Sequence, residues 1–258
     1  MNAEQIIAQS FQDQLPAETV TGVRPLLSGA VGSVLSGLDK DTSDVDRMSI
    51  YAYSNEVTVK AMIGGSNIKE AFFNADPDVF GYEAVRIAEL LLKSNAPVLN
   101  FMHARDYEAS TEIGLELVSI AQERFMTLDA LLRVFPASAN ASYRESLANA
   151  SRADMSSDTL IKDAPKNVAR KLKVAFVILE QISQALDNGF YQTLVEDRDW
   201  FLNVYPEMDY ASADALFLER LDKAKNVDPK SVNFRSMYTN DDVQVLRDWV
   251  FRAKDFRN

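Results

Sequence analysis

The order of apolar and polar positions divides the chain into two parts near residue 105. In the first part, short apolar segments alternate with clusters of Gly, Asp and Ser, a pattern typical of strands joined by tight turns. Helical spacing is limited there to 6–11, which ends near Pro16, and to 85–92, which is followed by a break at Pro97. Strands are predicted around 23–27, 45–51 and 79–82.

The second part of the chain has helical spacing almost throughout. Asn188-Gly189 is expected to end one helix, and Thr239, three residues before Asp242, is expected to begin another. The segment 137–158, rich in Ser, Ala and Asn, fits either a mobile loop or a weak helix. The apolar stripes lie within 113–132, 172–186, 216–221 and 243–250.

Together the two patterns predict an α+β fold, in which a small mixed-sheet domain over 1–104 precedes a helical domain over 105–258. The length of 258 residues suits one large or two modest domains. An apolar fraction of 47% with 25% charged residues is the balance of an ordinary globular protein.

The composition excludes several kinds of chemical site. With no Cys and one His, the chain cannot form a disulfide, a thiolate nucleophile or a multi-histidine zinc site. Any metal must therefore be held by carboxylates and water, which favours Mg²⁺, with Mn²⁺ as the alternative. His103 follows the apolar residues Phe101 and Met102, so we expect a structural role for it rather than general-base catalysis.

The net charge of −11 argues against a protein that coats long stretches of nucleic acid, because phosphate binding depends on clustered Lys and Arg. It leaves room for a local basic pocket. The longest apolar run, 174–179, is far shorter than the roughly 20 residues of a membrane span. Since the first residues also lack the features of a secretory signal, we expect a cytoplasmic protein with no membrane partner.

The stretch from Gly32-Ser33 to Asp44-Val45-Asp46 carries the candidate chemistry. A Gly-Ser turn exposes backbone N–H groups that suit phosphate oxygens. About ten residues later, Asp44 and Asp46 share one face of a strand if the chain is extended there. Two neighbouring carboxylates stay ionised together only when a cation neutralises them, and Mg²⁺ with substrate phosphates fits this requirement. A phosphate cradle beside a carboxylate pair suits nucleotidyl transfer.

The spacing of Gly-Ser and Asp-x-Asp resembles the DNA polymerase β-like nucleotidyltransferase superfamily. Two further stretches, 78–86 and 90–100, are similar to the phage and bacterial "RNA repair pathway DNA polymerase beta" family of predicted nucleotidyltransferases. This similarity is specific over 23–103 and general over the remainder of the chain.

The resemblance implies a role for each matching residue. Asp44 and Asp46 would ligate both catalytic Mg²⁺ ions, and Asp78 would supply the third carboxylate, on the acceptor side. Asp76 is an alternative to Asp78, although Pro77 makes a loop position more natural for it. The implied nucleotide-binding residues are Gly32, Ser33 and Ser43.

The chain departs from the family pattern at two positions. Val34 follows Gly-Ser, where the family commonly has a basic residue, and Ala96 interrupts the Asn-Pro pair. The charge of the triphosphate must therefore be neutralised by other residues. The candidates for this role are Arg47, Arg86, Lys93 and Lys171, with Arg170 beside Lys171 as a further one. For Arg86, exposure on a solvated helix face is as good an explanation as phosphate binding, and for Lys93 it is the favoured explanation.

The leading hypothesis is a Mg²⁺-dependent nucleotidyltransferase that moves an NMP from an NTP donor to a hydroxyl acceptor, with RNA or tRNA favoured and a small molecule or protein possible. An alternative is a degenerate member that binds nucleotides or proteins without turnover. A third hypothesis is a hydrolase that uses the same acids.

Overall fold

The structure is a computed structural model that describes residues 23–39, 45–65, 68, 70–75, 78–229 and 233–255. The side chains of 74, 75 and 78 lie outside this description. The helix expected over 6–11 also lies outside it. The described chain divides into two compact units. The first comprises the described residues of 1–35, 41–125 and 238–258, and the second those of 36–40 and 126–237.

The first unit contains a mixed sheet of five strands within the described residues, in the order β3-β4-β2-β1-β5. Strand β2 is antiparallel to β1 and parallel to β4, and the edge strands β3 and β5 are antiparallel to their neighbours. The three predicted strands correspond to β1, β2 and β4. The sequence analysis did not predict β3 or β5, which are short edge strands. The bounds are Val23–Ala30 (β1), Arg47–Tyr53 (β2), Ala71–Ala75 (β3), Asp78–Glu83 (β4) and Ala109–Ser110 (β5).

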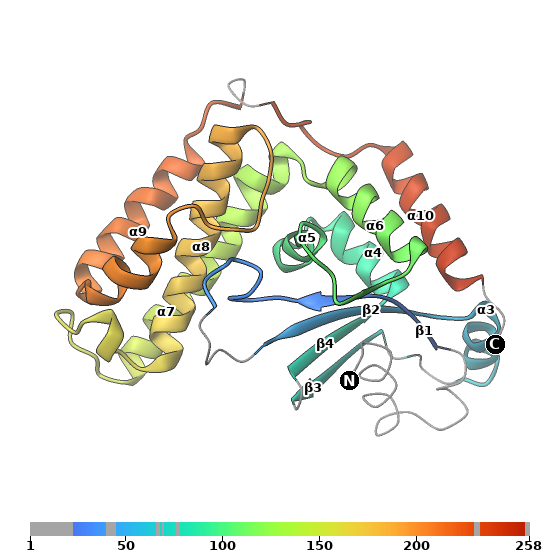
Figure 1. The fold of residues 1–258 in the computed structure, drawn as a ribbon, viewed down its shortest axis with the longest axis horizontal. Helices are drawn as coiled ribbons and strands as arrows, with labels where there is room; N and C mark the ends of the chain where they lie inside the picture. The colour runs from blue at the N-terminus through green and yellow to red at the C-terminus, as the bar shows by residue number, and fades with distance from the viewer. Residues whose placement is uncertain are drawn as a thin grey trace. The chain divides into compact units, whose positions relative to one another are not determined.

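Helices α4, α5 and α6 lie along one side of this sheet (Figure 1). Helix α4 buries an apolar stripe, as its spacing predicts. At its start Glu83 accepts a hydrogen bond from the Val85 N–H at 2.6 Å, which caps the helix. Helix α3, in contrast, has no buried residue. Among the described residues, the helices of the unit are Asn55–Ile63 (α3), Ala84–Leu92 (α4), Ala96–Met102 (α5), Glu112–Ile120 (α6) and Asn240–Lys254 (α10), with a short helical turn at Ala121–Phe125.

Helix α10 returns from the far end of the chain to pack on α4 and α6. The fully buried Trp249 donates its indole N–H to the Ile113 carbonyl at 2.8 Å. The Lys254 ammonium donates to the Glu83 carboxylate at 2.6 Å, and both side chains are buried. Contacts therefore join α6 and α10 to the unit that contains the sheet. The domain limit at 104/105 that the sequence analysis gave would place both helices in the helical domain.

In the described residues, the second unit is built around three long helices. Helix α7 occupies most of the segment 137–158, so the helix alternative is right there and the loop alternative is wrong for those residues. Small residues on its buried face allow close packing on α8, where the Ser146 hydroxyl donates to the Val168 carbonyl at 3.0 Å. Gly189, in the left-handed conformation, ends α8 as expected. The helices are Phe135–Arg152 (α7), Lys166–Asn188 (α8) and Tyr210–Lys225 (α9), with short helical turns at Ala130–Val134, Ile161–Asp163, Trp200–Val204 and Tyr205–Glu207.

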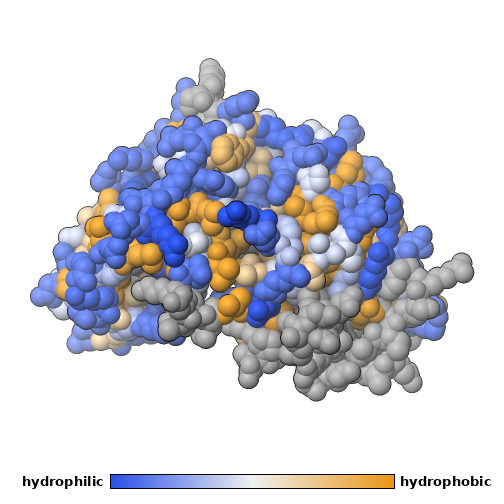
Figure 2. Space-filling view, in the orientation of Figure 1, coloured by the Kyte–Doolittle hydropathy of each residue, from blue (hydrophilic) through white to orange (hydrophobic). Residues whose placement is uncertain are grey.

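Hydrophilic residues cover most of the visible surface, with apolar residues exposed in patches between them (Figure 2). Among the described residues, no helix combines the length and the apolar character needed to cross a membrane. The small mixed sheet with many helices confirms the predicted α+β class.

Candidate active site

The turn after β1 brings Gly32 against the carboxylate of Asp46. Strand β1 pairs with β2 up to Ala30 and Arg47, and the Val31 N–H continues this pairing by donating to the Asp46 carbonyl at 2.9 Å. Gly32 then adopts the left-handed conformation, with φ +67°. A Cβ atom placed on Gly32 would lie 3.1 Å from Asp46 Oδ2. The carboxylate therefore approaches the backbone at a position where the absence of a side chain leaves space.

Asp78 begins the strand next to β2. The parallel register pairs Arg47 with Val79, so the backbone positions before them, Asp46 and Asp78, lie beside each other at the same end of the sheet. The side chain of Asp78 is not among those described, and Asp44, Ser43 and Asp76 lie outside the described residues. The pairing of Asp44 with Asp46, and the choice of Asp78 over Asp76, stay predictions.

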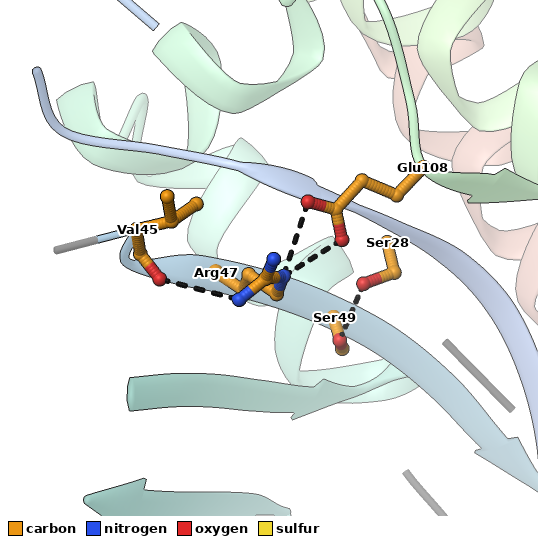
Figure 3. Close-up of polar contacts among 5 residues, drawn as sticks. All are labelled: Ser28, Val45, Arg47, Ser49 and Glu108. Carbon is orange, nitrogen blue, oxygen red and sulfur yellow. Dashed lines mark hydrogen bonds and ion pairs between the residues drawn. The ribbon is translucent and has the colours of Figure 1, made fainter. Parts of the chain in front are cut away.

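Arg47 directly follows Asp46 and is held by a carboxylate that the sequence analysis did not consider. Its Nε donates to both carboxylate oxygens of Glu108, at 3.0 and 2.8 Å (Figure 3). Its Nη1 donates to the Val45 carbonyl in a longer hydrogen bond of 3.4 Å. Glu108 is separated from Arg47 by 61 residues, so no local sequence signal connects the two.

Two buried hydroxyls lie next to this ion pair. Ser28 on β1 and Ser49 on β2 are register partners, and their Oγ atoms are 2.9 Å apart (Figure 3). One hydroxyl donates to the other inside the sheet, which supports a structural role for the pair.

The family model "RNA repair pathway DNA polymerase beta" matches residues 5–159. The chain belongs to this family. The matched range contains β1, β2, β4, the Gly32-Ser33 turn and Asp46, and it extends beyond the stretch 23–103 that carried the specific resemblance. The family is one of DNA polymerase β-like nucleotidyltransferases. Searches of curated proteins and of solved structures gave no match.

In this family member, three of the predicted phosphate-binding cations, Arg47, Arg86 and Lys171, are in ion pairs. Besides Arg47 with Glu108, Arg86 pairs with Glu89 at 2.8 Å in the first unit. Within the second unit, Lys171 pairs with Glu145 at 2.8 Å. Each cation would have to release or share its carboxylate to bind phosphate. Phosphate binding by these three residues stays a prediction.

Among the described side chains, no group of three or more His, Asp or Glu could hold a metal ion. The carboxylates of Asp44 and Asp78, two of the three expected ligands, are not in that set. His103 lies apart from such chemistry, because its Nδ1 is 2.8 Å from the Leu99 carbonyl and burial lowers its pKa to about 4. A neutral, hydrogen-bonded imidazole agrees with the structural role expected for it.

Proposed function

We propose that this protein is a Mg²⁺-dependent nucleotidyltransferase that moves an NMP from an NTP to a hydroxyl group of an RNA acceptor and releases pyrophosphate. Family membership supports the reaction class. The observation that carries the proposal is the approach of the Asp46 carboxylate to Gly32, at the start of β2, where the parallel register also begins β4. A phosphate-binding turn and a metal-binding carboxylate are both needed for this reaction.

The residues at this end of the sheet fit a hard divalent cation. Asp46 supplies a carboxylate oxygen, the donor that Mg²⁺ prefers, and Gly32 leaves the space beside it free of a side chain. Asp44 and Asp78 would complete the ligand set, as the resemblance implies. When bound, the metal ions would neutralise charge on the reacting phosphates, and Mn²⁺ would serve in place of Mg²⁺.

The chain's own residues would orient the two substrates. The backbone of Gly32 and the hydroxyl of Ser33 would bind the β- and γ-phosphates of the NTP, with Ser43 nearby in sequence. Asp78 would help to remove the proton of the acceptor hydroxyl. A bond then forms between that oxygen and the α-phosphorus, the bond from the α-phosphorus to the bridging oxygen breaks, and pyrophosphate leaves with the electron pair.

RNA is the acceptor that the family name favours, and tRNA is one form of it. The net charge of −11 favours a small contact area on it, such as one end of a strand. A small-molecule or protein acceptor is an outcome that the experiment below distinguishes. Val34, in place of a basic residue after Gly-Ser, favours the second candidate function, a member that binds nucleotide without turnover.

The test follows the transfer of label from each of four α-labelled NTPs, with Mg²⁺, into total RNA, total protein and small molecules. The Asp46→Asn variant is the control, since it keeps the volume of the side chain and removes its charge. We expect label in the RNA fraction with wild type and none with the variant. Label in another fraction would reassign the acceptor, and no label above the variant would refute the activity.

Two further variants decide the third carboxylate. We expect Asp78→Asn to abolish transfer and Asp76→Asn to keep it, and the reverse result would assign the role to Asp76. For the binding candidate, NTP would raise the melting temperature of the protein without Mg²⁺, whereas an enzyme of the proposed kind requires the metal for this effect.

A further inference from the structure

Two hydrogen bonds hold the backbone of Asp46 on both sides of its Cα atom. The Val31 N–H donates to the carbonyl of Asp46 itself, at 2.9 Å. The Arg47 guanidinium donates to the carbonyl of Val45, which belongs to the peptide bond before Asp46. The first bond comes from the neighbouring strand and the second from a side chain. A displacement of the Arg47 side chain would therefore remove one of these two contacts to the backbone around Asp46.

Glu108 holds Arg47, and the neighbours of Glu108 are themselves anchored. Before it, the Tyr107 hydroxyl donates to the Phe101 carbonyl at 3.0 Å, and the two rings meet edge to face. After it, β5 pairs Ala109 with Ser28 on β1. The carboxylate is thus presented from a short segment that is attached to α5 on one side and to the sheet on the other.

We propose that Arg47 and Glu108 form a positioning pair for Asp46. This inference rests on the proposed function. Glu108 orients the guanidinium, and the guanidinium fixes the Val45–Asp46 peptide so that the Asp46 carboxylate faces Gly32. Neither member of the pair touches the substrate in this assignment.

The geometry favours this role over direct phosphate binding by Arg47. Both carboxylate oxygens of Glu108 accept from Arg47 Nε, and the Arg47 side chain is only 24% exposed. A phosphate ligand would have to replace a charge-assisted contact that is already formed. Arg47 is also the first residue of β2. Because side chains alternate along a strand, it lies on the same face as Ser49, whose hydroxyl is buried against Ser28.

The test compares Arg47→Met, Glu108→Gln and the double variant with a matched control. Glu116→Gln removes the charge from another carboxylate that pairs with an arginine in the same unit, and the exposed fractions of Glu108 and Glu116 are 36% and 37%. Three quantities are measured: the dissociation constant for Mn²⁺ by electron paramagnetic resonance, kcat, and KM for the NTP. Melting temperatures identify any variant that fails to fold.

We expect each single variant to bind Mn²⁺ about three- to tenfold more weakly than wild type and to lower kcat about tenfold. KM for the NTP stays within about twofold of wild type, since no phosphate contact is lost. In the double variant, kcat and Mn²⁺ affinity are no lower than in the more impaired single variant, because the two residues act as one unit. Glu116→Gln behaves as wild type.

Two results would overturn the inference. A KM for the NTP that rises about tenfold in Arg47→Met, with Glu108→Gln unchanged, would make Arg47 a phosphate ligand. Mn²⁺ affinity and kcat equal to those of Glu116→Gln would remove any role for the pair at Asp46. Failure of the proposed function gives a different pattern, in which wild type transfers no more label than Asp46→Asn.

Discussion

Replacing Gly32 by Ala would test the geometry of the candidate site directly. The substitution has two separate physical effects. The φ of +67° puts Ala in the left-handed region, which costs about 1–2 kcal/mol relative to Gly. The new Cβ would also lie 3.1 Å from Asp46 Oδ2, which is closer than ordinary van der Waals contact. The carboxylate must therefore move by about 0.3 Å, given that C···O contacts are normally near 3.4 Å or more.

The two effects have different consequences. The backbone strain lowers the free energy of unfolding by about 1–2 kcal/mol and the melting temperature by a few degrees. The displacement of the carboxylate changes the geometry of the metal ligand. Since a 1 Å error in an active site can cost about a hundredfold in rate, a shift of about 0.3 Å is expected to lower kcat about fourfold.

The chain offers matched controls for each effect. Gly65 also has φ +67°, but no atom of the described residues lies within 4 Å of the position of its Cβ, so Gly65→Ala introduces mainly the strain. Gly37 has φ +71°, and its Cβ would meet Leu194 Cδ2 at 3.1 Å, so Gly37→Ala adds a close contact with an apolar side chain. Transfer of α-labelled NMP and the Mn²⁺ dissociation constant are measured for the three variants, together with urea unfolding.

We expect the three variants to be destabilised by similar amounts and only Gly32→Ala to lose activity and Mn²⁺ affinity. If Gly32→Ala retains the kcat and Mn²⁺ affinity of Gly65→Ala, the contact between Gly32 and the Asp46 carboxylate has no role in the site. Equal losses in all three variants would assign the effect to stability.

Three further predictions concern the first unit. Lys254→Met leaves the Glu83 carboxylate buried without its cation, so urea unfolding should show a loss of about 3–5 kcal/mol, part of which Glu83→Gln in the same chain restores. Burial lowers the pKa of His103 to about 4, below the unfolded value of about 6.5, so the unfolded chain takes up the proton first as the pH falls. The free energy of unfolding should therefore decrease between pH 6.5 and 4 by up to about 1.4 kcal/mol per pH unit more in wild type than in His103→Asn, and parallel pH profiles would contradict this. Trp249→Phe removes the indole N–H that donates to the Ile113 carbonyl in the first turn of α6, and should cost about 0.5–1.5 kcal/mol in the same assay, whereas an unchanged midpoint would show that the bond contributes nothing.

Much of the secondary structure follows from local pattern. The strands over 45–51 and 79–82 were predictable because β-branched and aromatic residues gather there, and the strand over 23–27 because a short apolar run precedes a segment of small turn residues. The start of α10 was predictable because Thr239 and Asp242 form a reciprocal capping box, which is encoded by residues three apart. Such features depend only on neighbours in sequence.

Other elements could not be decided locally. The segment 137–158 has small and polar residues that are compatible with a loop, and it becomes α7 mainly because those small residues let α8 approach closely. Strand β5 consists of two residues, too few for any periodic signal, and exists through its pairing with β1.

The sequence by itself determined the family, because the Gly-Ser and Asp-x-Asp spacing carries the resemblance that the family model confirms, and it excluded thiolate and multi-histidine sites through the absence of Cys and the single His. Tertiary structure alone decided which groups meet. The approach of Asp46 to Gly32 depends on the register of β1 and β2, and the contact of Arg47 with Glu108 spans 61 residues. The physical reason is that short side chains act over a few ångströms, so a contact between distant residues exists only after the backbone has been folded into place.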